Sequence, residues 1–191
     1  MNKAVFFDRD GTINIESGYI RDLNNVKLIP GAAQAIKRLK EAGFLAILIT
    51  NQSGPARGYY SEDWVNQLNQ KVQNLLVEQG TCLDEIYYCP HLPDGTVPEY
   101  TKVCDCRKPA IGLIQKAQTK FEIDLQNSFM LGDKATDVEL GQNAGCHPIL
   151  LKTGYGERVL SGNYQYIPDQ SIPYHIADNI SDAAQWILNN H

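Results

Sequence analysis

The chain has 191 residues, is 43% hydrophobic and carries a formal net charge of −5. A chain of this size can bury one sizeable core, which predicts a single domain over residues 1–191. The acidic balance argues against a nucleic-acid partner, because proteins that attract polyanions broadly present a basic face. We see no signal peptide, and no stretch approaches the roughly 20 apolar residues of a membrane span. We therefore expect a cytoplasmic monomer with reduced thiols and no membrane partner.

Apolar runs alternate with helical stripes along the chain. Pro30 suits the first turn of a helix and Ser61 suits an N-cap, so each indicates where a helix starts. In chain order, the patterns predict a strand at 3–7, a helix at 30–42, a strand at 44–49, a helix at 61–80, a strand at 85–88, a helix from Pro109, a strand at 128–131, a helix at 136–143, a strand at 148–151 and a helix at 181–190.

This alternation predicts an α/β fold, namely a doubly wound and mostly parallel sheet with helices on both faces. In such a sheet, ligands bind at the carboxyl ends of the strands. Segments 89–108 and 152–175 show no periodicity, and segments of that length are usually functional or mobile. Segment 12–29 is too short for a large cap domain. Substrate specificity must therefore come from loops.

The first predicted strand ends in two aspartates, Asp8 and Asp10. Residues two apart in a strand point the same way, so the two carboxylates leave the strand end together, and Gly11 lets the backbone turn away at once. Two neighbouring carboxylates stay ionised most easily beside a cation, and oxygen ligands suit Mg²⁺. The pattern predicts a site for metal-assisted phosphoryl chemistry.

Polar residues follow the later strands as well. Phosphoryl transfer needs a hydroxyl donor, a cation and further carboxylates, and the chain offers Thr50, Lys108 and Asp133 at suitable positions. Taken singly, such residues also suit turns and helix caps. Asp137 lies one helical turn after Asp133, and we expect it to orient Lys134 or a metal-bound water rather than to bind the metal.

Four motifs follow one another in order, namely Asp8-x-Asp10-Gly-Thr, Thr50 after an apolar strand, Lys108 before a helix, and Gly132-Asp133-x₃-Asp137. Together they resemble the motifs of the haloacid dehalogenase superfamily of phosphatases. The resemblance implies that Asp8 attacks phosphorus and becomes an aspartyl phosphate, and that Asp10 first protonates the leaving oxygen and then deprotonates water. It also implies that Asp8, the carbonyl of Asp10 and Asp133 hold Mg²⁺. Thr50 and Lys108 would hold the phosphoryl oxygens.

Elementary electrostatics agrees with these roles. A carboxylate that attacks a phosphate dianion meets like-charge repulsion, which Mg²⁺ and Lys108 must neutralise. Asp10 must carry a proton when the ester bond breaks. We expect the charges of Asp8 and the leaving group to raise the pKa of Asp10 for this purpose.

A second cluster consists of Cys89, His91, Cys104 and Cys106. The order C-x-H…C-x-C provides three thiolates and one imidazole, a Cys₃His set that suits tetrahedral Zn²⁺. The alternatives are free loop cysteines, or disulfides in an oxidising compartment, and a reducing compartment favours zinc. Four protein ligands close such a site, so we expect a structural zinc ion that pins the loop ending before Arg107.

Further stretches, at 50–54, 56–58, 87–91 and 104–109, resemble the branch of this superfamily that acts on heptose bisphosphates. This resemblance implies removal of the 7-phosphate from a heptose 1,7-bisphosphate, a small-molecule sugar bisphosphate on the route to nucleotide-activated heptose for lipopolysaccharide or other surface glycans. A second phosphate needs its own cation, and an arginine can hold it through two parallel N–H bonds. The predicted substrate-binding residues are Glu16, Ser17, Gly18, Tyr19, Asn51, Gln52, Ser53, Arg57, Arg107 and Lys134.

Two alternative functions stay open at this point. Histidinol-phosphate phosphatase, of the same subgroup, shares the catalytic motifs and a similar zinc loop, although segment 92–103 has the length that the heptose branch requires. A non-catalytic zinc-loop binding module is the second alternative. Such a module would lack at least one catalytic residue. The residues in question are Asp8, Asp10, Lys108 and Asp133, and all four are present. Arg57 also suits a solvated loop charge.

Overall fold

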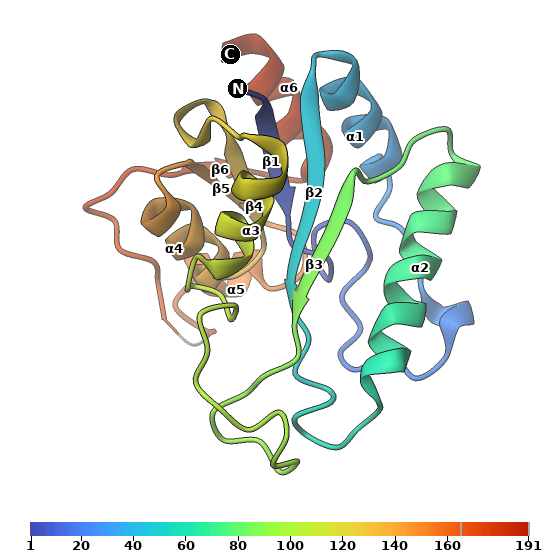
Figure 1. Ribbon diagram of the computed structural model, residues 1–191. Coiled ribbons are helices and arrows are strands. Elements are labelled where there is room, and N and C mark those ends of the chain that lie inside the picture. Colours follow the sequence, from blue (N-terminus) through green and yellow to red (C-terminus); the bar gives the residue numbers. More distant parts are fainter. Residues whose placement is uncertain (165, 191) are drawn as a thin grey trace.

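The structure, a computed structural model, describes residues 1–164 and 166–190. Within these residues, six parallel strands form one sheet in the order β3-β2-β1-β4-β5-β6 (Figure 1). The strands are β1 (Lys3–Phe7), β2 (Phe44–Asn51), β3 (Glu85–Cys89), β4 (Phe129–Gly132), β5 (His147–Leu151) and β6 (His175–Ala177). The helices are α1 (Ala32–Glu41), α2 (Glu62–Glu78), α3 (Gly112–Phe121), α4 (Ala135–Ala144), α5 (Gly156–Leu160) and α6 (Ile180–Asn190), with 3₁₀ turns η1 (Leu23–Asn25) and η2 (Leu125–Asn127). The predicted doubly wound parallel sheet is confirmed.

Helices cover both faces of this sheet. α1, α2 and α6 pack on one face, and α3, α4 and α5 pack on the other. Because side chains alternate along a strand, Val5 and Phe7 of β1 contact the first layer while Ala4 and Phe6 contact the second. A strand that is buried on both faces reads as a continuous apolar run, as β1 and β2 do. In the described part of the chain, no helix has the length and apolar character to cross a membrane.

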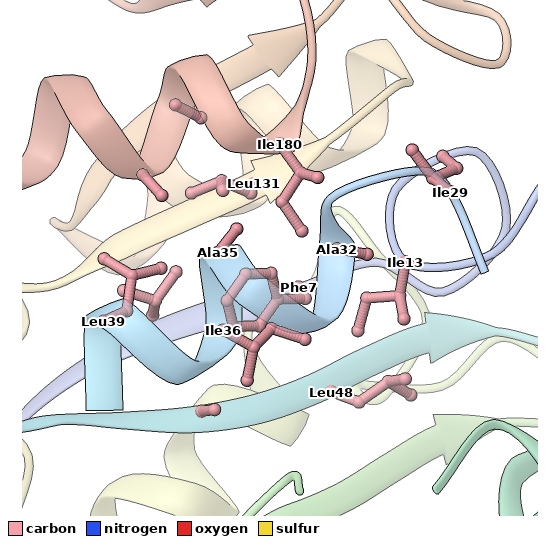
Figure 2. Packing of buried hydrophobic residues seen from close by; sticks show 14 of the residues in the cluster. Phe7, Ile13, Ile29, Ala32, Ala35, Ile36, Leu39, Leu48, Leu131 and Ile180 are labelled. Atoms are coloured by element: carbon pink, nitrogen blue, oxygen red, sulfur yellow. The ribbon is translucent and has the colours of Figure 1, made fainter. Parts of the chain in front are cut away.

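One cluster of buried side chains joins the sheet to α1 (Figure 2). Phe7 of β1 and Leu48 of β2 lie beside Ala32 and Ile36 of α1, and Ile180 of α6 closes the same cluster. Burial of a large apolar side chain contributes roughly 1.5–3 kcal/mol to folding. The cluster fixes β1 in the middle of the sheet, and β1 carries the first two aspartates at its carboxyl end.

The strand order reverses between β1 and β4. At such a switch point, the connections from two neighbouring strands leave in opposite directions and open a crevice between them. Asp8 follows β1 and Asp133 follows β4. The topology therefore brings these two carboxylates, which are far apart in the sequence, to the same crevice.

The helix expected to begin at Pro109 begins later, at Gly112. The backbone first makes a turn in which the N–H of Ala110 donates to the carbonyl of Arg107 at 2.9 Å. This turn joins the end of the predicted cysteine loop to the helix.

The segment 152–175, which showed no periodicity, contains the helix α5, and the strand β6 begins at its last residue. These elements have five and three residues. Elements this short do not complete enough turns or alternations to produce a readable pattern. Residue 165 of this segment lies outside the described residues.

Two valines of α2 allow a matched test of the core. Val72 is 1% exposed and Val77 is 58% exposed. We expect Val72→Ala to lower the free energy of unfolding by about 2 kcal/mol, because it removes buried methyl groups and leaves a cavity. Val77→Ala should stay within about 0.5 kcal/mol of the parent chain. Urea denaturation followed by circular dichroism measures both values, and equal losses would contradict the packing described here.

Candidate active site and metal clusters

Asp8 lies immediately after β1, where its backbone N–H donates to the carbonyl of Leu131 at 2.9 Å. The chain turns away at Gly11, which has a φ of +85°. A Cβ at Gly11 would collide with the carboxylate of Asp133. Glycine is therefore needed there both for the left-handed backbone and for the close approach of that carboxylate.

Two ammonium groups contact the carboxylate of Asp8. Lys108 Nζ lies 2.8 Å from one oxygen, and Lys134 Nζ lies 3.2 Å from the other. Burial by itself would raise the pKa of Asp8, but the charges of the two lysines outweigh burial and hold that pKa well below its usual range. Asp8 is therefore an ionised carboxylate at neutral pH, as a nucleophile must be.

Lys108 is buried and held by three acceptors. Its ammonium group contacts Asp8, Asp137 at 2.7 Å and the carbonyl of Ile49 at 3.0 Å. The side-chain amide of Asn51 also fixes its backbone, because Asn51 accepts from the N–H of Lys108 and donates to its carbonyl. The loop before α3 thus delivers one cation to the carboxyl end of β1.

Asp137 has one expected partner and one unexpected partner. We expected it to orient Lys134 or a metal-bound water, and its carboxylate accepts from the backbone N–H of Lys134 at 3.0 Å. The carboxylate also contacts the ammonium group of Lys108. The one-turn spacing from Asp133 predicted the proximity of Asp137 to the site, but it could not reveal Lys108, which comes from a distant loop.

Asp133 follows β4 and is fully buried. Its carboxylate accepts from the backbone N–H of Tyr155 at 2.8 Å and contacts Lys134 Nζ at 2.9 Å. Burial raises the pKa of Asp133 to about 7, and the neighbouring carboxylates add to the increase. A buried carboxylate of this kind is stabilised in its ionised form by a cation.

The oxygen atoms at this point fit a hard divalent cation. Carboxylate oxygens of Asp8, Asp133 and Asp137 lie within 4.8 Å of one another. Lys134 Nζ also lies 3.4 Å from the carbonyl of Asp10, so this carbonyl faces the same place. Oxygen donors of this type are the usual ligands of Mg²⁺. The ligand set that the resemblance implies is therefore brought together by the fold.

The electrostatic environment of Asp10 differs from our expectation. Arg9 is buried and forms two bonds to the carboxylate of Asp10, from Nη2 at 2.9 Å and from Nε at 3.2 Å. Gln52 and Asn14 donate to the same carboxylate, each at 2.9 Å. Burial would raise the pKa of Asp10, but Arg9 and the hydrogen bond from Asn14 lower it below its usual value. The charge of Asp8 raises the pKa of Asp10 as expected, but Arg9 outweighs it; the contribution of a leaving group stays a prediction.

Sequence reasoning missed Arg9 because it treated that residue only as the spacer between two aspartates. The buried guanidinium also donates to Asn69 of α2 at 2.9 Å and to Gln52 at 2.8 Å. An arginine next to a motif aspartate is the only signal in the sequence, and it does not reveal burial.

Nine of the ten predicted substrate-binding residues line one cavity of about 310 Å³. Ser17 is the exception, since it lines a neighbouring cavity together with Thr153 and Arg158. Four lining residues were not predicted, namely Tyr60, Thr136, Tyr155 and Tyr164. The rings of Tyr155 and Tyr164 stack with centroids 4.4 Å apart. Both come from segment 152–175, which shows no periodicity in the sequence.

Two arginines line the same cavity. Arg107 Nη1 donates to the carbonyl of His91 at 3.0 Å. Arg57 has a buried Nε atom with no hydrogen-bond partner among the described residues. The loop that carries Arg57 is tied to the cysteine loop, because the carbonyl of Ala56 accepts from the N–H groups of Thr96 and Val97. Both guanidinium groups therefore depend on the cysteine loop for their positions.

The four predicted zinc ligands converge on one point. Cys106 Sγ lies 3.2 Å from Cys89 Sγ, 3.2 Å from Cys104 Sγ and 3.3 Å from His91 Nδ1. In a tetrahedral zinc site each sulfur lies about 2.3 Å from the metal, and the ligand atoms lie only slightly further from one another than they do here. Burial raises the pKa of the Cys89 thiol, so a bound cation is needed to keep it as a thiolate. The cluster fits Zn²⁺.

The fold and this site define a hydrolase of the haloacid dehalogenase superfamily. The sequence model of haloacid dehalogenase-like hydrolases matches residues 5–79, and a HAD-hydrolase-like model matches residues 105–183. A solved structure of D,D-heptose 1,7-bisphosphate phosphatase from B. bronchiseptica, complexed with magnesium and phosphate, is 30% identical. It superimposes with a TM-score of 0.84 and covers 99% of each chain.

Curated relatives narrow the assignment further. D-glycero-D-manno-heptose-1,7-bisphosphate 7-phosphatase of Thermosynechococcus vestitus is 48% identical over 98% of this chain and 96% of that protein. D-glycero-beta-D-manno-heptose-1,7-bisphosphate 7-phosphatase of Haemophilus influenzae is 43% identical over 95% of each chain. The chain belongs to the family of D-glycero-D-manno-heptose-1,7-bisphosphate 7-phosphatases, which are phosphoric monoester hydrolases.

Substitution of single cysteines tests the zinc cluster. We expect the protein, purified under reducing conditions, to hold about one zinc ion per chain by elemental analysis. Cys104→Ser should lose that zinc, because it removes one of four ligands. Cys82→Ser is the matched control, since Cys82 lies outside the cluster and should not alter the metal content. Zinc retained by both variants, or absent from the parent protein, would contradict the assignment.

Proposed function

We propose that the protein is a Mg²⁺-dependent phosphatase that removes the 7-phosphate of D-glycero-D-manno-heptose 1,7-bisphosphate through an aspartyl phosphate on Asp8. The observation that carries the proposal is the ionised carboxylate of Asp8, held between Lys108 and Lys134 at the carboxyl end of the central strand. The names of the relatives supply the substrate. In this proposal the enzyme acts as a cytoplasmic monomer in the synthesis of nucleotide-activated heptose.

Asp8 and Asp10 have separate roles in the proposed reaction. Asp8 forms a bond to phosphorus while the bond between phosphorus and the sugar oxygen breaks. Asp10 gives a proton to that oxygen and later takes one from the water that hydrolyses the aspartyl phosphate. Because Arg9 favours the ionised form of Asp10, the negative charge of the arriving phosphate has to offset the guanidinium before Asp10 can hold this proton.

The phosphoryl group lies between the metal-binding carboxylates and Lys108 in this proposal. Asp8, the carbonyl of Asp10 and Asp133 would hold Mg²⁺, which when bound neutralises charge on the phosphoryl oxygens. The ammonium group of Lys108 and the hydroxyl of Thr50 hold those oxygens from the other side. Thr50 is free to donate, because its oxygen accepts the amide of Gln52 at 3.0 Å.

The second phosphate of the substrate needs cations away from Asp8. Arg107 and Arg57 line the same cavity and are the candidates, since a guanidinium binds phosphate through two parallel hydrogen bonds. Zinc takes no chemical part in this proposal. Zinc would hold the cysteine loop, which carries Arg107 and supports the neighbouring loop of Arg57.

A panel of phosphate esters tests the substrate. We expect the purified protein to release one phosphate from heptose 1,7-bisphosphate, supplied as separate α and β anomers, faster than from histidinol phosphate or fructose 1,6-bisphosphate. The measurement is kcat/KM for each compound from released inorganic phosphate. A preference for histidinol phosphate would overturn the proposed substrate and leave the phosphatase chemistry in place.

Asp8→Asn tests the nucleophile. The amide neither attacks phosphorus nor binds Mg²⁺ well, so kcat should fall by about a thousandfold or more. Circular dichroism checks that the variant folds. Turnover at a similar rate in a folded Asp8→Asn protein would contradict the covalent route.

Arg107→Met tests recognition of the second phosphate. Loss of a charged hydrogen bond should raise KM for the bisphosphate about tenfold. A sugar carrying only the 7-phosphate is the control, and its KM should change little. Equal changes for both substrates would show that Arg107 does not bind the second phosphate.

A further inference from the structure

Lys134 is anchored by its backbone and reaches into the site with its side chain. Its N–H donates to Asp137 at 3.0 Å, at the start of α4. Its ammonium group lies 5.4 Å from the centre of the Tyr155 ring, at the wall of the cavity. The backbone of Lys134 is thus held at the start of α4 while its side chain lines the cavity.

The ammonium group of Lys134 contacts oxygens of three residues, which come from two separate parts of the chain. The distances are 2.9 Å to Asp133, 3.2 Å to Asp8 and 3.4 Å to the carbonyl of Asp10. Glu16 lies 3.7 Å away and adds a weaker attraction. An ammonium ion with three donors is therefore matched by three acceptors.

These three residues are the ones that would hold Mg²⁺ under the proposed function. Mg²⁺ binds its ligands at about 2.0–2.1 Å in near-octahedral geometry and does not tolerate a crowded site. Asp8 and Asp133 are buried, whereas Asp10 and Lys134 line the cavity beside them. Lys134 therefore occupies the side from which a cation would reach these oxygens. Two cations that share the same oxygens at contact distance repel each other strongly.

We propose that Lys134 is a built-in counter-ion of the metal site, which holds the ligand oxygens together without metal and is displaced when Mg²⁺ binds. This inference rests on the proposed function for the identity of the ligands. Moving the ammonium group of Lys134 away from these oxygens costs free energy, so Lys134 weakens metal binding in the substrate-free protein. The displaced ammonium group then lies free in the cavity, where the phosphate of a substrate offers it a new partner.

Calorimetric titration of substrate-free protein with Mg²⁺ tests the inference. Lys134→Met should bind Mg²⁺ about tenfold more tightly than the parent chain, because no ammonium group has to leave. Arg107→Met is the matched control. It removes the same charge from the same cavity but touches none of the three oxygens, and its affinity for Mg²⁺ should change little. An unchanged or weaker affinity in Lys134→Met would overturn the inference, as would an equal gain in both variants.

Crystal structures of the parent protein give a second readout that does not depend on a variant. Without metal, Lys134 Nζ should contact Asp8, Asp133 and the carbonyl of Asp10. With Mg²⁺ bound, it should have left these oxygens. If all three contacts persist beside bound Mg²⁺, the inference is wrong. Neither experiment uses a sugar substrate, so failure of the substrate panel would leave this result standing.

Discussion

The site depends on one cluster of five charged side chains at the switch point of the sheet. Three carboxylates, Asp8, Asp133 and Asp137, contact two ammonium groups, Lys108 and Lys134. With all three carboxylates ionised, the cluster carries one surplus negative charge in a place where an unpaired charge is costly. A divalent cation would turn the surplus into one positive charge, and a phosphate dianion would then be attracted. The elevated pKa of Asp133 is a direct consequence of this surplus and of burial.

The remainder of the fold serves to hold these charges in place. The core between the sheet and α1 fixes β1, and the parallel pairing of β1 with β4 fixes the distance between Asp8 and Asp133. The cysteine cluster acts at the other side of the cavity. It closes a loop that supports Arg107 through the carbonyl of His91, and it supports the neighbouring loop of Arg57 through Ala56. The same loop thus carries the catalytic cation Lys108 and the neighbouring Arg107.

Patterns in the sequence predicted the strand–helix alternation, the convergence of the four motifs and the Cys₃His cluster, because each rests on local spacing or on the shared edge of a parallel sheet. They did not predict contacts that depend on tertiary packing. Asp137 contacts Lys108 across the site. Arg9 is buried against Asn69 of α2 and bonds to Asp10, so it lowers the pKa of Asp10 although the charge of Asp8 raises it. The N–H of Tyr155, which binds Asp133, belongs to a loop whose backbone chemistry has no side-chain signature.

Under the proposed function, Asp8 becomes covalently phosphorylated. Acid quenching of the enzyme during turnover of heptose 1,7-bisphosphate, followed by borohydride reduction and peptide mass spectrometry, reads this step directly, because an aspartyl phosphate is reduced to homoserine. We expect homoserine at position 8 in the working enzyme and unmodified Asp8 when substrate is omitted. Sustained turnover with Asp8 unmodified, or reduction at another aspartate, would show that Asp8 is not the nucleophile.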